Sequence, residues 1–428
     1  MKKAAFYTLG CKVNQYETQA MKEMFINSGY EICEFSDMAD VYVVNSCTVT
    51  ATGDKKSRQA IRRAKRINPD CISVLTGCYA QSLNKEQIKE LGADIVIGTG
   101  KRNEIIEAVE KALKEKNAYM FVDKLSKHTE FEETPVTDFD SKTRAMIKIQ
   151  DGCDRFCSYC IIPYVRGPVR SRNLKSIVKE AERLSENSFK EVVLTGIQVA
   201  AYGKDSEGDL TTVIEEVSKT EKIERIRLSS LEVVAITEDF LKRTLKTGKL
   251  CPSFHLSLQS GSDSVLKRMN RRYNAEEYYE AVQKIKKYYP DAAITTDIIV
   301  GFPGETEEEF EESYAFAEKV GFAKIHVFPY SKREGTKAAL MEGQIENKVK
   351  EDRLKKMIGL GEKLHHEFLK QNIGKEHKVL FEQKNEEDYY VGYTENYIKV
   401  RLKSDNDLTD KVISVLLSDE NVLSDDEN

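Results

Sequence analysis

Short apolar runs alternate with amphipathic stretches in the first quarter of the chain. The runs are rich in β-branched and aromatic residues, and they cover residues 4–9, 40–46, 72–77 and 94–98. Stretches with the apolar spacing of helices separate them, at 16–28, 55–66 and 103–116. This alternation predicts an α/β fold class, with an N-terminal parallel-sheet domain over residues 1–120.

A polar segment without a clear period follows at 121–143 and is predicted to be a linker. The alternation then resumes with longer units. Predicted strands lie at 145–150, 191–195, 225–229, 253–258, 293–300 and 324–328. Predicted helices lie at 174–187, 209–219, 238–247, 275–288, 306–319 and about 345–371. Six strand-helix units predict a partial (β/α)6 barrel over 144–372, with its sites at the C-terminal strand ends.

The pattern changes again near the C-terminus. Alternating runs at 377–383, 389–394, 397–402 and 411–417, with a hairpin turn at 394–396, predict a small antiparallel β-barrel over 373–428. Such barrels often bind nucleic acid, yet acidic residues outnumber basic ones here. Lys399, Arg401 and Lys403 alternate on one strand face and would form a local basic stripe. The acidic residues 419–428 are predicted to be disordered.

Three cysteines follow the first strand of the barrel, spaced Cys153-x3-Cys157-x2-Cys160. Three thiolates in so short a loop can hold one iron-sulfur cluster and leave one iron open to a small molecule. A zinc knuckle usually has a fourth ligand and a second pair downstream, which this loop lacks. Three packed structural cysteines are the remaining alternative.

A second set of cysteines shares a different property. Cys11, Cys47 and Cys78 each stand just past the end of a predicted N-terminal strand. The carboxyl ends of parallel strands meet at one sheet edge, so this placement predicts a second three-ligand cluster. Taken singly, each would be an ordinary buried thiol, which is how we interpret Cys33, Cys71 and Cys251.

Composition limits the class of protein. With 428 residues and 40% hydrophobic content, the chain can form two or three domains with real cores. An odd number of cysteines, nine, argues against a simple disulfide framework, and their cluster-like spacing implies a reducing compartment. We see no signal peptide and no apolar run that would span a membrane, so we expect a cytoplasmic protein with no membrane partner. A net charge of −5 does not indicate nucleic acid, which has to be argued from local patches.

Together these motifs resemble the radical S-adenosylmethionine (SAM) methylthiotransferases, enzymes that insert sulfur and add a methyl group. The segments 8–18, 328–336 and 392–400 are similar to the branch that acts on N6-threonylcarbamoyladenosine in tRNA. The isopentenyladenosine branch usually has Gly-Cys-Gln-Met-Asn at the first cysteine, and the ribosomal-protein branch has Gly-Cys-Pro-Lys-Asn. Here Cys11 is followed by Lys12, Val13 and Asn14.

The resemblance implies conversion of N6-threonylcarbamoyladenosine at tRNA position 37, beside the anticodon, to its 2-methylthio derivative. It implies two [4Fe-4S] clusters, two SAM molecules per turnover and a C-terminal TRAM-like barrel. Cys153, Cys157 and Cys160 would hold the cluster that reductively cleaves SAM, so that a radical can attack adenine C2. Cys11, Cys47 and Cys78 would hold the cluster that carries sulfur. No catalytic side chain is implied beyond these ligands.

Implied partners are tRNA, a low-potential electron donor such as flavodoxin or ferredoxin, and a sulfur donor. Two alternatives within the family are methylthiolation of isopentenyladenosine tRNA and of a ribosomal-protein aspartate. A non-catalytic iron-sulfur regulator that binds RNA is an alternative outside the enzyme class.

Several residues are candidates for binding SAM by the same resemblance. Tyr159 precedes the last cysteine, and the turn after the second barrel strand carries Thr195, Gly196 and Gln198. The superfamily often has Gly-Gly-Glu in that turn, facing the methionine amine, so neutral hydrogen bonding would replace the acid here. Ser257, Gln259, Val300 and Phe302 end later strands and would border the sugar and adenine. A turn that needs glycine is the simpler interpretation of Gly196.

Two groups of arginines are candidates for the substrate. Arg166, Arg170 and Arg172 follow the cluster loop, and guanidinium suits phosphate and planar carboxylate groups. Salt bridges within the barrel are the alternative. On the helix at 55–66, Lys55, Arg58, Arg62 and Lys65 share a face. We expect Arg62 and Arg66 to contact tRNA phosphates, with a solvated face as the alternative.

Overall fold

The structure is a computed structural model that describes residues 1–115, 119–123, 125–126, 128–139 and 143–424. The predicted helix end at Lys116, part of the predicted linker and the last four residues of the predicted acidic tail lie outside the described residues.

A six-stranded parallel sheet forms the N-terminal part, in the order β2-β1-β3-β4-β5-β6. The strands are β1 Lys3–Thr8, β2 Glu31–Cys33, β3 Val41–Ser46, β4 Ile72–Gly77, β5 Ile95–Ile97 and β6 Tyr119–Phe121. The helices are α1 Lys12–Asn27, α2 Ala51–Ile67, α3 Cys78–Ser82, α4 Lys85–Leu91 and α5 Ile105–Glu115. Helix α2 covers one face of the sheet, and α1 and α5 cover the other. Both faces are therefore buried, which explains the unbroken apolar runs and confirms the predicted parallel sheet.

The central part is a six-stranded parallel half-barrel. Its strands are β7 Arg144–Lys148, β10 Glu191–Thr195, β11 Arg225–Leu228, β12 Ser253–His255, β13 Ala293–Val300 and β14 Lys324–Pro329. They form two ladders, β11-β10-β7 and β12-β13-β14, which single bridges at Ile226–Leu250 and Leu231–Leu256 connect. The outer helices are α7 Leu174–Glu186, α8 Leu210–Ser218, α9 Glu238–Thr247, α11 Ala275–Tyr288, α12 Glu307–Val320 and α13 Asn347–Asn372. The predicted partial (β/α)6 barrel is confirmed.

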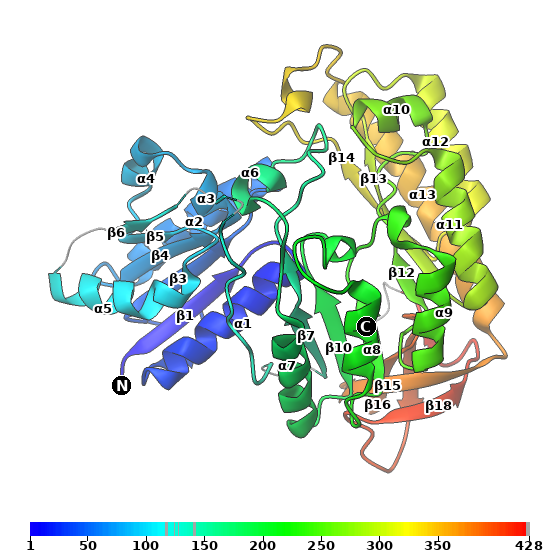
Figure 1. Cartoon of the computed structure of the whole chain (residues 1–428), viewed down its shortest axis with the longest axis horizontal. Helices are drawn as coiled ribbons and strands as arrows, with labels where there is room; N and C mark the ends of the chain where they lie inside the picture. The colour runs from blue at the N-terminus through cyan, green and yellow to red at the C-terminus, as the bar shows by residue number, and fades with distance from the viewer. Residues whose placement is uncertain (116–118, 124, 127, 140–142, 425–428) are drawn as a thin grey trace.

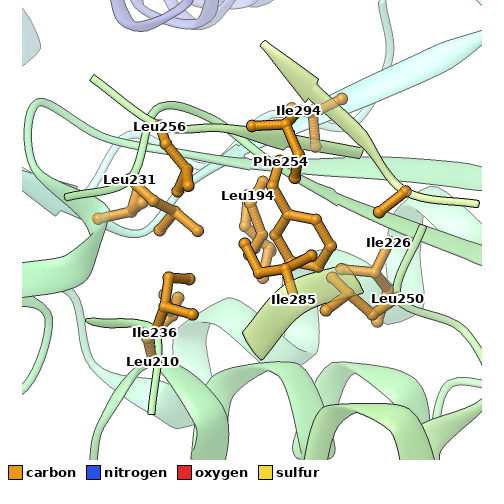
Figure 2. Packing of buried hydrophobic residues seen from close by; sticks show 14 of the residues in the cluster. Leu194, Leu210, Ile226, Leu231, Ile236, Leu250, Phe254, Leu256, Ile285 and Ile294 are labelled. Atoms are coloured by element: carbon orange, nitrogen blue, oxygen red, sulfur yellow. The ribbon is translucent and has the colours of Figure 1, made fainter. Parts of the chain in front are cut away.

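The barrel core lies between the strands and the outer helices. Figure 2 shows Leu194, Phe254 and Ile294 from the strands packed against Leu210 and Ile285 from the helices. Short elements at the cluster end of the barrel have too few residues to show a period in sequence. These are β8 Gln150–Asp151, α6 Ile162–Arg166, β9 Arg170–Ser171 and α10 Asp263–Arg268, with four 3-10 turns elsewhere in the described chain.

The C-terminal part is a five-stranded antiparallel sheet in the order β18-β15-β16-β17-β19. Its strands are β15 Glu376–Lys384, β16 Tyr389–Thr394, β17 Lys399–Lys403, β18 Val412–Leu416 and β19 Val422–Leu423. The predicted hairpin turn joins β16 to β17. The predicted tail starts too early, because β19 lies inside it and pairs with β17 at Lys399 and Val400.

Helix α1 joins the N-terminal sheet to the barrel. It packs on β1 and on β7, the edge strand of the half-barrel (Figure 1). The predicted linker also takes part, since Val136 and Phe139 are buried in the barrel core beside Tyr16 of α1. In the described part of the chain, no helix has the length and apolar character needed to cross a membrane.

Candidate functional site

The loop that carries Cys153, Cys157 and Cys160 is shaped by its surroundings. Gly152 has a φ of +75°, and a Cβ there would lie 1.9 Å from the carbonyl oxygen of Pro168, so only glycine fits. Phe156 also has a positive φ, +47°, and Asn270 Nδ2 donates to its carbonyl at 3.0 Å. A bulky residue in this conformation costs about 1–3 kcal/mol, which such contacts must offset.

The thiols of this loop are partly or fully buried. Burial raises the pKa of Cys153 to about 11 and that of Cys160 to about 12. Such thiols stay protonated in the bare chain, and a bound metal would displace their protons. The nearest polar groups are Gln198 Oε1, 3.4 Å from Cys153 Sγ, and Arg271 Nη1, 3.3 Å from Cys157 Sγ. Gln198 Oε1 accepts from the Cys153 thiol, whereas the Arg271 guanidinium donates to the Cys157 sulfur. A donor of the second kind tunes an iron-sulfur cluster.

Cys11, Cys47 and Cys78 follow β1, β3 and β4, which are neighbours in the N-terminal sheet. A Cβ on Gly10 would lie 3.0 Å from Cys47 Sγ, so the loops after β1 and β3 touch. Cys78 is buried, and its pKa is raised to about 11 by that burial. The structure thus brings the second set together at one sheet edge.

The assignment of both triplets to iron-sulfur clusters stays a prediction. Within the described residues, no group of three His, Cys, Asp or Glu side chains could hold a metal ion. In a cluster each thiolate binds a different iron, so its ligands need not converge on one point.

The turn after β10 lies against the Cys153 loop. Gln150 Oε1 accepts a hydrogen bond from the backbone N–H of Gln198 at 2.7 Å, and a Cβ on Gly196 would come within 2.9 Å of it. Glu232 accepts from Gln198 Nε2 at 2.9 Å and from Arg155 Nε at 2.6 Å. A carboxylate, that of Glu232 in the segment after β11, therefore lies beside this turn.

Sequence reasoning missed Glu232 and Arg271. Arg271 is 3.7 Å from Glu232 and hydrogen-bonds the carbonyl of Ser257 at 3.2 Å. The position of Glu232, just past a barrel strand, was the available signal. Arg271 follows a helix too short to be recognised, so no such signal marked it.

The remaining SAM candidates lie on the same end of the barrel. Tyr159 packs on a buried cluster that contains Phe302 and Met269. Gln259 has a φ of +73° and is held by the backbone of Asp297, whose carbonyl accepts its N–H at 2.8 Å. Val300 is buried at the end of β13, and the Ser257 carbonyl also accepts from Tyr273. Their contact with SAM stays a prediction.

A cavity of about 750 Å³ runs through the barrel interior. Cys11 and Lys12 line one side of it, and Thr195 and Gly196 line another. His255, Asp297, His326 and Phe328 from the barrel strands also line it, with Ser229 and Ser230 from the segment after β11. The C-terminal sheet adds Tyr393 of β16 and Tyr397 of the turn before β17. The volume suits a group of nucleoside size.

The arginines after the cluster loop are not open to a substrate. Arg166 pairs with Glu17 and Asp151, Arg172 pairs with Glu180 and Glu133, and Arg170 donates to the carbonyl of Arg166. All three are buried. This is a correction to their interpretation as substrate-binding residues, because carboxylates and carbonyls already occupy their donors. The salt-bridge alternative describes them, and the pairs extend to the N-terminal part.

On helix α2, two of the basic residues predicted to share one face are bound to other side chains. Arg58 donates to Tyr79 at 2.9 Å, and Lys65 pairs with Asp94 at 2.7 Å. Arg62 and Arg66 are exposed. Their contact with tRNA stays a prediction.

Two family models match parts of the chain: Radical SAM superfamily over residues 147–317, and Uncharacterized protein family UPF0004 over residues 3–98. The chain is 44% identical to threonylcarbamoyladenosine tRNA methylthiotransferase MtaB of Bacillus subtilis (strain 168), over 97% of this chain and 93% of that protein. It is 42% identical to the protein of the same name from Aquifex aeolicus (strain VF5), over 97% of this chain and 100% of that protein.

A second Bacillus subtilis relative, tRNA-2-methylthio-N(6)-dimethylallyladenosine synthase, is 36% identical over 95% of this chain and 82% of that protein. Among solved structures, the radical S-adenosylmethionine methyltransferase TsrM from Kitasatospora setae has a TM-score of 0.58 at 13% identity. That match covers 77% of this chain and 72% of TsrM, and at this identity it concerns the fold alone.

Proposed function

Because the chain belongs to the tRNA methylthiotransferase family of radical SAM enzymes, we propose that it converts N6-threonylcarbamoyladenosine at tRNA position 37 to its 2-methylthio derivative. Of the two Bacillus subtilis relatives, the one named for threonylcarbamoyladenosine shares more identical residues, 44% against 36%. The motif at Cys11-Lys12-Val13-Asn14 supports the same branch.

The barrel cavity carries this proposal. It joins Cys11 of one cysteine triplet to Thr195 and Gly196, the turn that packs on the loop of the other. When bound, the two [4Fe-4S] clusters supply the electron that cleaves SAM and the sulfur that is transferred. An adenine in this cavity would lie between the two centres, so orientation and exclusion of water fall to the barrel walls.

The residues around the cavity can take specific roles. Gln198 and Glu232 would bind the SAM ammonium group, and the Glu232 carboxylate can accept a hydrogen bond from it directly. Tyr159, Phe302 and Val300 would form the apolar border of the adenine of SAM, with Ser257 and Gln259 at its sugar. Cys11, at the cavity wall, would hold the sulfur-carrying cluster where adenine C2 can reach it.

Lys12 is the candidate partner of the threonyl carboxylate. It is exposed, lines the cavity directly after Cys11, and has no hydrogen-bond or ion-pair partner in the described chain. Arg144, another cation of the cavity wall, is already paired with Glu382 and Glu191. Isopentenyladenosine has no carboxylate, so this lysine would distinguish the two substrates.

The other partners belong to the same proposal. Arg62 and Arg66 on α2 would hold tRNA phosphates. A flavodoxin or ferredoxin would supply low-potential electrons, and a separate sulfur donor would renew the sulfur. The nine cysteines, all free thiols in the structure, fit a reducing cytoplasm.

The test is a comparison of substrates. Anaerobically reconstituted enzyme, SAM and a strong reductant are incubated with tRNA carrying threonylcarbamoyladenosine, with tRNA carrying isopentenyladenosine, or with the ribosomal protein. Mass spectrometry should find the methylthio group on the first. Its appearance on either other substrate alone would contradict the branch, and its absence from all three would contradict the function.

A further inference from the structure

Arg166 connects the two cysteine triplets directly. It is the last residue of α6, the helix that begins just after the Cys153 loop. Its side chain is 0% exposed. Its Nε–H points at the other triplet and donates to Cys78 Sγ at 3.2 Å. One guanidinium therefore reaches from the barrel to a ligand of the N-terminal centre.

The other two nitrogens of the guanidinium bind carboxylates of both the N-terminal part and the barrel. Nη1 donates to Glu17 Oε1 of α1 at 2.7 Å and to the Asp151 carboxylate at 3.2 Å. Nη2 donates to Glu17 Oε2 at 3.0 Å. Because Asp151 stands two residues before Cys153, the same group is tied to the start of the cluster loop.

Asn14 extends this control to the rest of the N-terminal triplet. Its Oδ1 accepts from Arg166 Nη2 at 2.7 Å. Its Nδ2 donates to the carbonyls of Leu9, at 2.6 Å, and Ser46, at 3.0 Å. These carbonyls stand directly before Gly10-Cys11 and before Cys47. Through Asn14, Arg166 thus fixes the loops of two further cysteines.

Only arginine can make this set of contacts. Its planar fork offers donors in three directions, whereas a lysine has one nitrogen on a flexible stem. A charge-assisted N–H to a ligand sulfur favours the electron-rich state of a cluster and so raises its reduction potential. Groups that orient metal ligands in this way typically affect affinity or activity by about 10- to 100-fold.

We propose that Arg166 is a positioning residue that locks the N-terminal cluster centre to the SAM-cleaving loop and raises the reduction potential of the N-terminal cluster. This inference rests on the proposed two-cluster function. Arg166 would lie between the two cluster centres. There it would fix the position of the sulfur-carrying centre relative to the cavity.

The experiment isolates the N-terminal cluster. In a Cys153→Ala, Cys157→Ala, Cys160→Ala background, Arg166→Lys is compared with its parent after anaerobic reconstitution, by iron content, EPR of the reduced cluster and midpoint potential. Arg102→Lys is the matched control, because buried Arg102 also pairs with Glu17, at 2.6 Å, while its Nη1 donates to Glu132 and to the carbonyl of Thr99. In the otherwise native enzyme, methylthio product per 5′-deoxyadenosine is measured.

We expect Arg166→Lys to change the EPR signal, make the potential more negative and lower product per 5′-deoxyadenosine about tenfold or more, while Arg102→Lys keeps the parental signal and potential. A parental EPR signal and potential in Arg166→Lys, or an equal shift in Arg102→Lys, would overturn the proposal. If Arg166→Lys does not fold, the charge-balanced Arg166→Gln, Glu17→Gln variant must show the same shift. Should the native enzyme modify no tRNA, the proposed function fails, yet the EPR comparison still decides the role of Arg166.

Discussion

Lys12 lines the cavity next to Cys11, where a single charge can select the substrate. Replacing it by Gln keeps most of the side-chain length and removes the charge. A hydrogen bond to a charged group contributes about 1.5–3 kcal/mol, so Lys12→Gln should lower kcat/KM for threonylcarbamoyladenosine tRNA about 10- to 100-fold. Single-turnover assays with mass detection measure this loss.

The matched control is Lys179→Gln, an equal change at an exposed position on α7 outside the barrel. It should leave kcat/KM unchanged. A Lys12→Gln enzyme with parental kcat/KM would remove Lys12 from substrate recognition.

Single site residues could be predicted from the sequence where a metal-binding residue type also recurs at a telling spacing. Cys153, Cys157 and Cys160 stand in one short loop, and Cys11, Cys47 and Cys78 share a position after strands. Glu232 and Arg271 reach the site from segments far apart in sequence; the place of Glu232 just past a barrel strand was its only signal, and Arg271 had none. The sequence correctly predicted that the Arg166 guanidinium lies near the cluster loop. It could not predict that Arg166 is buried, because that burial depends on packing between two parts of the chain.

At the scale of elements, helix α1 holds the N-terminal part against the barrel through Glu17. Burial raises the pKa of Glu17, but Arg102, Arg166 and Lys148 outweigh it and hold that pKa well below its ordinary 4.5. The unfolded chain therefore takes up a proton first as the pH falls. The contribution of these ion pairs is complete above pH 4.5 and is lost as the pH falls from there toward the folded-state pKa.

Glu17→Gln should lower the free energy of unfolding at pH 7 by about 3–5 kcal/mol, because it leaves buried cations underpaired. It should also make stability less dependent on pH between about pH 5 and pH 3. Urea unfolding of the cluster-free chain at several pH values measures both effects. Parallel pH profiles for the two chains would show that Glu17 is not the titrating group.

Helix α2 is the element proposed to hold tRNA. Arg62→Glu with Arg66→Glu should weaken tRNA binding and reduce the slope of log K against log salt by roughly 0.7–0.9 for each phosphate that the helix no longer neutralises. Lys242→Glu with Lys246→Glu makes the same charge change at the same spacing on exposed positions of α9. Equal effects of the two double variants would indicate general repulsion of tRNA by added negative charge. No effect of Arg62→Glu with Arg66→Glu would show that this face of α2 is only solvated.

The sequence pattern predicted whether an element is a helix or a strand wherever the element is long enough to show such a pattern. All six barrel strands and their outer helices were predicted, because the strands are short, mainly apolar runs and the helices between them repeat apolar positions at helical spacing over several turns. The two-residue strands β8 and β9 and the single-turn helix α6 show no period. They form because the cluster loop closes on itself, with Cys153 N–H donating to the carbonyl of Gly167 at 3.0 Å.

At the scale of the whole molecule, the C-terminal sheet is held against strand β11 of the barrel. Arg225 and Arg227 of β11 donate to the carbonyls of Tyr393, Thr394 and Glu395, at 2.7–3.0 Å. The Arg227 guanidinium also lies 3.8 Å from the centre of the Tyr397 ring. This docking was not visible in sequence, since both arginines sit inside an apolar strand pattern. It places Tyr393 and Tyr397 in the cavity wall, so this sheet can shape the substrate site despite its acidic composition.

Arg227→Ala tests that role. Removing one partner of a buried ion pair costs about 3–5 kcal/mol, and Glu191 keeps Arg225 at 2.8 Å, so the barrel itself should stay folded. We expect hydrogen exchange to speed up in β16 and β17 but not in β10. Without tRNA, 5′-deoxyadenosine should form at the parental rate, because the cluster loop lies at the opposite end of the strands. With tRNA, methylthio product should fall, because part of the cavity wall is then loosened. Parental exchange in β16 and β17 would show that Arg227 does not hold the sheet, and parental product formation with a loosened sheet would remove the sheet from the substrate site.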